Sequence, residues 1–460
     1  MKHDAPPPLS RDPLPPDLRV GLLAVGRDRP GFDPEWGERM HHAARKMVRE
    51  LPGMTAENAA LAVDDASMRQ AVEGFIAEGC DALIVIQPTM GDGRLVPLLA
   101  QLWHGTMVLW ATTENPDADR VSACTLVGTH VFASQLRQAD RPMEVLSGSP
   151  QTPATRDRLA HRARCVAAAA RLRKCKLGLV GNHAPGFLNL HVDPAALDAA
   201  LGVSMRRFAV AEMMQAITDA HEDRVAEEFH ELQALQLPRE NGITDDHLRL
   251  AARYRVALES MMDHDRLDAM AVRCWPELPN THGVWPYLAF ARLGQAGRLI
   301  AMEGDVDAAA TLLMGRLLGA GVGYVSDWLE HDGNRITLWH QGEAPLQWSD
   351  PASIEIGHHF NNGLPGVVNS TLQPREAITL ARLWRCDGQY HLTAVPARLD
   401  RPPRPLKGVS ATAELADRTA DAWFEAACQA GMPHHLVLLD GDHRDAFHRL
   451  ARLLGLQWHD

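Results

Sequence analysis

The chain has 460 residues, of which 46% are hydrophobic, and a formal net charge of −12. Its length predicts two to four domains. The acidic charge, without a long run of one sign, argues against nucleic acid or an anionic membrane as the partner. The N-terminus lacks an apolar signal core and no apolar stretch could span a bilayer, so we expect a cytoplasmic protein. The 7 cysteines are scattered without CxxC spacing, which disfavours structural zinc and a disulfide framework.

The first region alternates short apolar runs with helix-period segments. Residues 1–17, rich in proline, are predicted to form a flexible tail. Strands are predicted at Val20–Val25, Ala59–Val63, Ala82–Ile86 and Met107–Trp110, and helices near Trp36–Leu51, Ser67–Glu78 and Arg94–Trp103. This alternation predicts a parallel sheet covered on both faces, within residues 18–150.

A second α/β region follows at residues 151–320. Strands are predicted at Lys176–Val180, Leu267–Val272 and Leu299–Met302, and helices at Thr155–Arg173, Asp223–Leu235, Asp245–Asp263 and Asp305–Leu318. Asp305 is a plausible N-cap for the last helix, because its short carboxylate can accept from free backbone N–H groups. The turn between the strand Leu299–Met302 and this last helix carries Glu303.

The third region, residues 321–460, has a different character. Short β-like runs with turn residues replace the alternation, at Gly323–Val325, Arg335–Trp339, Ala377–Trp384 and Tyr390–Val395. A helix at Ala413–Ala430, a strand at Leu436–Leu439 and a helix at Asp445–Leu453 are predicted to close the chain. This pattern indicates a β-rich domain.

Two carboxylates, Glu303 and Asp327, each follow an apolar strand-like run. In open α/β sheets such positions project into the crevice that binds ligands, and Gly304 allows the tight turn that Glu303 needs. With a later histidine, they could form a hard-cation site and a proton-transfer pair. The alternatives are a first-turn glutamate favoured by a helix dipole, and an ordinary turn or N-cap aspartate.

The choice of histidine is open from spacing alone. His443 follows a strand and opens a helix, but it could equally be an exposed helix-start residue; the pairs His434-His435 and His358-His359 compete with it as ligands. His340 also follows a strand and could contact substrate, supply a further ligand or lie half-buried at a sheet edge. No GxGxxG, P-loop, GxSxG or HExxH pattern is present, which disfavours nucleotide enzymes, serine hydrolases and zincins.

Five segments, taken in order, resemble the L-fucose/L-arabinose isomerase superfamily, in particular its shorter fucose-isomerase-like members. The segments are Arg29-Pro-Gly-Phe-Asp33, Ala271-Val-Arg-Cys-Trp-Pro276, Met302-Glu-Gly-Asp-Val306, Leu338-Trp-His-Gln-Gly-Glu-Ala-Pro345 and Pro433 to His443. They correspond to the family's Arg-Pro-Thr-Phe-Asp loop, Cys-Trp-Pro strand end, Glu-Gly-Asp metal motif, Leu-Trp-His-Cys-Gly-Asn-Ala-Pro stretch and terminal histidine segment. The resemblance spans nearly the whole chain after residue 18.

The resemblance implies an α/β protein of two Rossmann-like, doubly wound domains, 18–150 and 151–320, followed by a β-rich, barrel-like domain, 321–460. It implies a divalent metal, Mn²⁺ before Mg²⁺ or Co²⁺, held by Glu303, Asp327 and His443. It also implies a homo-oligomer, with a hexamer favoured, whose active site is completed by a neighbour's first domain, so that Arg29 acts in trans. Arg29, Arg273, Trp275 and His340 are the expected substrate-binding residues.

Two positions depart from the family pattern. Arg273 replaces a glutamine before Cys-Trp-Pro, and Gln341 replaces a cysteine after His340. Because a guanidinium binds carboxylate, phosphate or sulfonate through a bidentate fork, we hypothesise a sugar substrate that carries an anionic group or otherwise differs from fucose. The alternative is a salt bridge between Arg273 and a local carboxylate.

The function that follows is metal-dependent interconversion of an aldose and a ketose through an enediol(ate). A metal chelated by two sugar oxygens would stabilise the enediolate, and Glu303 and Asp327, as ligands and acid/base pair, would move the proton between C1 and C2. The rival readings are a non-catalytic sugar-binding protein and another metal-assisted sugar enzyme, an epimerase or aldolase.

Overall fold

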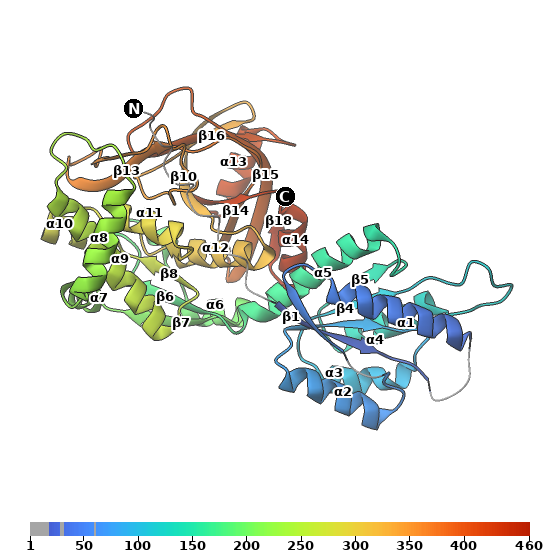
Figure 1. Cartoon of the computed structure of the whole chain (residues 1–460). Helices are drawn as coiled ribbons and strands as arrows, with labels where there is room; N and C mark the ends of the chain where they lie inside the picture. Colours follow the sequence, from blue (N-terminus) through green and yellow to red (C-terminus); the bar gives the residue numbers. More distant parts are fainter. Residues whose placement is uncertain (1–17, 28–31, 59–60) are drawn as a thin grey trace, which may run out of the picture. The chain divides into compact units, whose positions relative to one another are not determined.

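The structure, a computed structural model, describes residues 18–27, 32–58 and 61–460 in two compact units (Figure 1). The first unit holds the described residues up to Arg173 together with Arg449–Gly455, and the second holds Lys174–His448 and Leu456–Asp460. The predicted tail, residues 1–17, and Arg29 lie outside the described residues.

The first unit contains a five-stranded parallel sheet in the order β2-β1-β3-β4-β5. Strands β3 and β4 are continuous buried apolar runs, as expected for a parallel sheet with both faces covered. Its elements are β1 Leu18–Ala24, α1 Pro34–Arg49, β2 Met54–Asn58, α2 Asp65–Ala77, β3 Ala82–Ile86, α3 Val96–Leu102, β4 Met107–Ala111, α4 Thr125–Gln138, β5 Met143–Ser147 and α5 Pro153–Leu172.

Residues 59 and 60 of the predicted strand Ala59–Val63 lie outside the described residues. In the described part, strand β2 precedes the prediction and Ala62 makes an isolated bridge to Val25. The β2 segment, Met-Thr-Ala-Glu-Asn, is polar enough to read as a loop, but pairing with β1 over its whole length overrides that composition. Helix α5, predicted to open the second region, belongs to the first unit.

The second unit begins with a four-stranded parallel sheet in the order β7-β6-β8-β9. Because the strands are parallel, the loops after β6, β8 and β9 all leave from one edge of the sheet. The elements are β6 Lys176–Val180, α6 Pro194–Leu201, β7 Ser204–Phe208, α7 Val210–Thr218, α8 Glu222–Ala234, α9 Asp245–Asp265, β8 Ala269–Val272, α10 Glu277–His282, α11 Tyr287–Gln295, β9 Leu299–Ala301 and α12 Val306–Leu318.

A nine-stranded mixed sheet completes the second unit. Strand β15 pairs with both β14 and β16, so the pairings β16-β11-β10-β17-β14-β15 return to β16 and close a circuit around a buried apolar core. The remaining elements are β10 Tyr324–Asp332, β11 Arg335–His340, β12 Glu355–His358, β13 Pro365–Thr371, β14 Arg375–Cys386, β15 Gln389–Asp400, β16 Val409–Leu415, α13 Ala420–Gln429, β17 His435–Asp440, α14 Arg444–Leu454 and β18 Gln457–His459, and the part of α14 from Arg449 on belongs to the first unit.

The predicted helix Ala413–Ala430 is wrong in its first part. Residues up to Leu415 belong to β16, which pairs with β11 and β15, and α13 starts only after the N-cap Thr419. The alanines of this segment favour a helix locally, but they fill the core between paired strands. The predicted α/β class with parallel sheets is confirmed, and the chain also contains one large mixed sheet.

Within the described residues, no helix is long and apolar enough to cross a membrane.

Candidate metal and active site

Glu303 lies at the carboxyl edge of the four-stranded sheet, two residues after β9. Its φ is 59° and that of Gly304 is 72°, so two consecutive left-handed residues turn the chain sharply between β9 and α12. A Cβ on Gly304 would stand 2.2 Å from the carbonyl oxygen of Asn182, in the loop after β6. Glycine is therefore required here, and the turn holds the Glu303 side chain buried, with 2% of its surface exposed.

One oxygen of the Glu303 carboxylate is held by two side-chain donors. Trp275, in the loop after β8, donates its indole N–H to Oε1 at 3.0 Å, and Gln341, just after β11, donates its amide N–H to the same atom at 2.9 Å. The second oxygen, Oε2, is directed to imidazoles: it lies 3.4 Å from His435 Nε2 and 4.0 Å from His434 Nε2. The carboxylate is thus fixed on one side and open on the other.

Three neighbouring strands of the mixed sheet bring the other groups to this point. Strand β10 pairs with β17 so that Asp327 is opposite His435, and with β11 so that Asp327 is opposite Trp339, next to His340. Asp327 Oδ1 lies 3.7 Å from His435 Nε2 and 3.9 Å from His434 Nε2. The sequence analysis predicted that Asp327 follows a short strand. In the structure it lies within β10, because this strand continues to Asp332.

Two of the histidines share one arrangement. His435 Nδ1 is 2.7 Å from Asp305 Oδ2, and His340 Nδ1 is 2.8 Å from Glu343 Oε1. All four side chains are buried. A carboxylate on Nδ1 orients the ring and leaves Nε2 for a metal, the usual outer support of metal-binding histidines.

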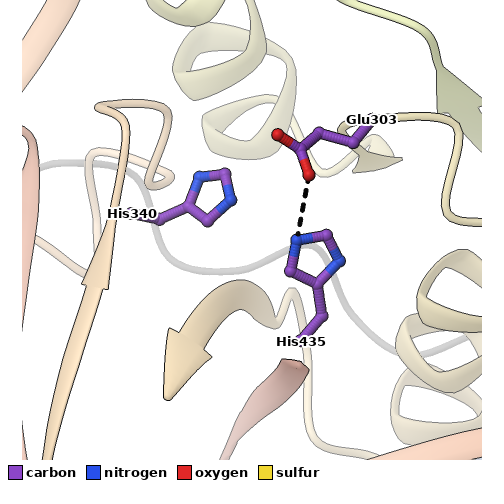
Figure 2. A group of neighbouring side chains, drawn as sticks. All are labelled: Glu303, His340 and His435. Carbon is purple, nitrogen blue, oxygen red and sulfur yellow. Dashed lines mark ion pairs between the residues drawn. The ribbon is translucent and has the colours of Figure 1, made fainter. Parts of the chain in front are cut away.

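The Nε2 atoms of His340, His434 and His435 and Oδ1 of Asp327 are buried and, among the described residues, have no hydrogen-bond partner. Two groups bring ligand atoms within 4.8 Å of one another: Glu303 with His340 and His435, and Asp327 with His434 and His435. Figure 2 shows the rings of His340 and His435 facing the Glu303 carboxylate. Since buried polar atoms without a partner are costly, this convergence of carboxylates and imidazoles fits a divalent cation.

The electrostatics of these groups also support a divalent-cation site. Burial alone would raise the pKa of Glu303, but the neighbouring imidazoles of His434 and His435 hold it well below its usual range. Burial would lower the histidine pKa values, but Glu343 and Asp327 raise that of His340 to about 9, and Asp305 and Glu303 raise that of His435 to about 10. Protons on the imidazoles thus balance the carboxylates, and a cation can replace those protons.

His443 is not brought to this site. It follows β17 at the end opposite His435, about 20 Å away for a six-residue strand, and its Nε2 lies 2.7 Å from the carbonyl oxygen of Asp440. Spacing could not separate His443 from His434-His435. The pairing of β17 with β10 does so, because it sets His435 opposite Asp327.

The predicted substrate residues have different surroundings. Trp275 contacts Glu303, as described above, and His340 belongs to one of the two groups that could hold a metal ion. Arg273 instead forms a bidentate ion pair with Glu277, at 3.0 Å from Nε and 2.6 Å from Nη2. The alternative of a local salt bridge is thus present in the structure, although both side chains remain about a quarter exposed.

The sequence reasoning missed three outer residues of the site. Asp305 was recognised only as the N-cap of α12. Its carboxylate also accepts hydrogen bonds from Arg382 at 2.7 and 3.1 Å and lies beside His435 Nδ1. Arg382 comes from β14 and is fully buried. Glu343 gave one available signal, since it is a charged residue directly before the apolar run Ala344-Pro345-Leu346.

Comparisons with known proteins point in one direction. A model of the L-arabinose isomerase central domain matches residues 192–321. A sulfoquinovose isomerase of Priestia megaterium (strain ATCC 12872 / QMB1551) is 24% identical over 383 residues, 82% of this chain and 84% of that protein. An L-arabinose isomerase of Geobacillus kaustophilus (strain HTA426) is 25% identical over 205 residues, 42% of this chain and 40% of that protein.

Among solved structures, a periplasmic solute binding protein of an ABC transporter from Actinobacillus succinogenes 130z, with bound D-allose, aligns at 12% identity. The alignment covers 65% of this chain and 92% of that one with a TM-score of 0.18, which is too low to carry an argument. The family-model match and the curated relatives support the resemblance of this chain to the arabinose- and fucose-isomerase-like superfamily.

Proposed function

We propose that this protein is a metal-dependent aldose–ketose isomerase that acts on a sugar through an enediol(ate). The names of its relatives support an aldose–ketose isomerase. The observation that carries the metal dependence is the set of buried imidazole Nε2 atoms, without partners, that face the carboxylates of Glu303 and Asp327.

Four residues would hold the cation: Glu303, Asp327, His435 and His340. His435 takes the place that the sequence analysis gave to His443. Carboxylate oxygens with imidazoles suit Mn²⁺, with Mg²⁺ and Co²⁺ as alternatives. When bound, the divalent ion supplies Lewis acidity that polarises the sugar carbonyl and stabilises negative charge on the enediolate oxygens.

The protein's own groups would move the proton between C1 and C2. Glu303 Oε2 and Asp327 Oδ1 both approach Nε2 of His435, at 3.4 and 3.7 Å. An ionised carboxylate on one side takes the proton and returns it to the neighbouring carbon. Trp275 and Gln341 both donate to Oε1 of Glu303 and leave Oε2 directed toward the imidazoles.

His434 would serve substrate and not metal. The amide nitrogen of Asn189, which can only donate, lies 3.3 Å from its Nδ1. A neutral ring that accepts at Nδ1 carries its proton on Nε2 and can donate it to a sugar oxygen. Phe187 packs against this ring at 4.8 Å and would help to exclude water.

The substrate class that we propose is an aldose with an anionic group, with sulfoquinovose, a sulfonated sugar, as the first candidate. The sulfoquinovose isomerases among the relatives match over most of the chain. Arg273 stands two residues from Trp275, and its guanidinium could bind the anion if one of its two contacts with Glu277 is released. Arg273→Gln should raise the KM for anionic sugars alone; equal KM values for neutral and anionic sugars would remove Arg273 from recognition.

We also propose that the protein forms a homo-oligomer in which the first domain of a neighbouring subunit supplies Arg29 to the active site. Its test is the mass of the native protein in solution together with the turnover of Arg29→Ala.

The deciding experiment uses full-length protein stripped of metal and reloaded with Mn²⁺. It is incubated in deuterated water with a panel of neutral and anionic aldoses and ketoses, including sulfoquinovose. Metal-dependent isomer formation, with deuterium at C1 or C2, is the expected result. Epimers or cleaved products would favour the epimerase or aldolase reading, and sugar binding without turnover the binding-protein reading.

A further inference from the structure

We infer that Gln341 is a positioning residue that fixes the Glu303 carboxylate through a directed chain of hydrogen bonds. The inference rests on the proposed function, because it assigns Glu303 a role in holding the metal. Gln341 occupies the position where the family pattern that the sequence resembles has cysteine.

The orientation of the Gln341 amide is determined by its neighbours. Its Oε1 receives the hydroxyl of Tyr287 at 3.0 Å and lies 3.0 Å from His359 Nε2. With donors on the oxygen side, the NH₂ group must face Glu303, where it donates to Oε1 at 2.9 Å. A flipped amide would direct oxygen at a carboxylate and NH₂ at two donors.

Each donor is fixed in turn. The backbone N–H of Asn361 donates to His359 Nδ1 at 3.3 Å, so the neutral ring carries its proton on Nε2 and donates to Gln341. His359 is buried and stacks on Trp285 with ring centroids 4.0 Å apart. Because the Tyr287 hydroxyl donates to Gln341, its oxygen is free to accept from the Cys274 thiol at 3.7 Å.

The chain of bonds therefore runs in one direction, toward Glu303. Together with Trp275, Gln341 holds Oε1 by two N–H donors and leaves Oε2 for the cation. Such outer partners typically contribute 10–100-fold to metal affinity or activity, about the range expected here. Among the described residues, the side-chain hydrogen bonds of Tyr287 and His359, which set the direction, go to Gln341, Cys274 and Asn361 and not to Glu303 Oε2 or to the imidazoles whose Nε2 atoms are open.

The test measures the affinity of metal-free protein for Mn²⁺ by electron paramagnetic resonance, in four variants. Gln341→Met removes the amide at similar size, and Gln341→Glu sets a second carboxylate against Glu303. The double variant Tyr287→Phe/His359→Phe keeps Gln341 but removes the groups that orient it. Gln373→Met is the matched control, since Gln373 is bonded to backbone carbonyls of Gln347 and Ser349 away from the site.

We expect the Mn²⁺ dissociation constant to rise about tenfold in Gln341→Met and the double variant, and more in Gln341→Glu, with Gln373→Met unchanged. Metal-free crystals of Gln341→Met should show Glu303 in a different or divided conformation. An unchanged dissociation constant and an unchanged Glu303 conformer would overturn the inference.

The two proposals fail separately. A wild-type protein that binds Mn²⁺ but isomerises no sugar contradicts the proposed function, while the affinity ratios still decide the role of Gln341. If wild-type protein binds no Mn²⁺, the metal dependence is wrong, and the Glu303 conformer in Gln341→Met decides the inference.

Discussion

Glu114 in the first unit and Glu303 in the second both follow a strand at the carboxyl edge of a parallel sheet, yet their surroundings differ. Glu114 is exposed, and its oxygens accept from the backbone N–H groups of Ser122, Ala123 and Cys124 and from the Ser122 hydroxyl. Burial alone would raise the pKa of Glu114, but these donors outweigh it and lower the pKa. Glu303 is buried and keeps one oxygen facing imidazoles whose Nε2 atoms lack hydrogen-bond partners.

The comparison teaches that a carboxylate at a strand end is not by itself a functional signal. Glu114 completes a loop that closes on itself, whereas Glu303 leaves a set of buried atoms that a ligand must satisfy. The predictions below test this difference.

The largest effect is expected for Glu303→Gln, which removes the charge but keeps the shape. Turnover of the isomerised sugar should fall by about 10²–10⁴-fold, the range typical for a lost acid–base group. Steady-state kinetics on Mn²⁺-loaded protein measure this. A fully active Glu303→Gln variant would exclude Glu303 from the chemistry and erase its contrast with Glu114.

The second prediction concerns the support behind His435. Arg382→Met removes the guanidinium that pairs with buried Asp305, leaving this carboxylate with His435 and the backbone N–H of Ala308, and should cost about 3–5 kcal/mol in the free energy of unfolding. Denaturant titration, with circular dichroism as the readout, measures it. The control is Arg398→Met, because the Arg398 guanidinium pairs with Glu414 at the surface and its removal should cause no measurable loss in the free energy of unfolding. Equal losses in both variants would contradict the buried role of Arg382.

Metal binding should stabilise the second unit and not the first. At a Mn²⁺ concentration of about 100 times the dissociation constant, the expected gain is about 2.7 kcal/mol. Hydrogen exchange should show slower exchange in β10, β11 and β17 and none of this protection in the sheet that precedes Glu114. Protection spread equally over both units, or confined to the first, would refute the assignment of the cation to the Glu303 site.

The smallest effect is expected for Glu114→Gln. An amide cannot accept from all four donors, so the loop around α4's first turn should lose about 1 kcal/mol of stability. Sugar turnover should stay unchanged. A loss of turnover comparable to that of Glu303→Gln would show that the first unit's strand end also takes part in the reaction.

Local pattern predicted much of the fold. Strands β3 and β6 were predicted residue for residue, because each is a short apolar run bounded by turn residues. The N-cap role of Asp305 was also predicted and is confirmed. The failures lie at β2 and β16, whose compositions favour a loop and a helix, and which become strands only through the partners they pair with.

For the candidate site, the sequence by itself predicted the two carboxylates and determined the strand-end turn at Glu303-Gly304, because a motif and its glycine are local. It also limited the histidine ligands to a few pairs. Only the tertiary structure selected His435 over His443, since the register between β10 and β17 decides which residue faces Asp327. The same holds for Glu343, Arg382 and the Gln341 amide, whose roles arise from strands and loops that meet only in the folded chain.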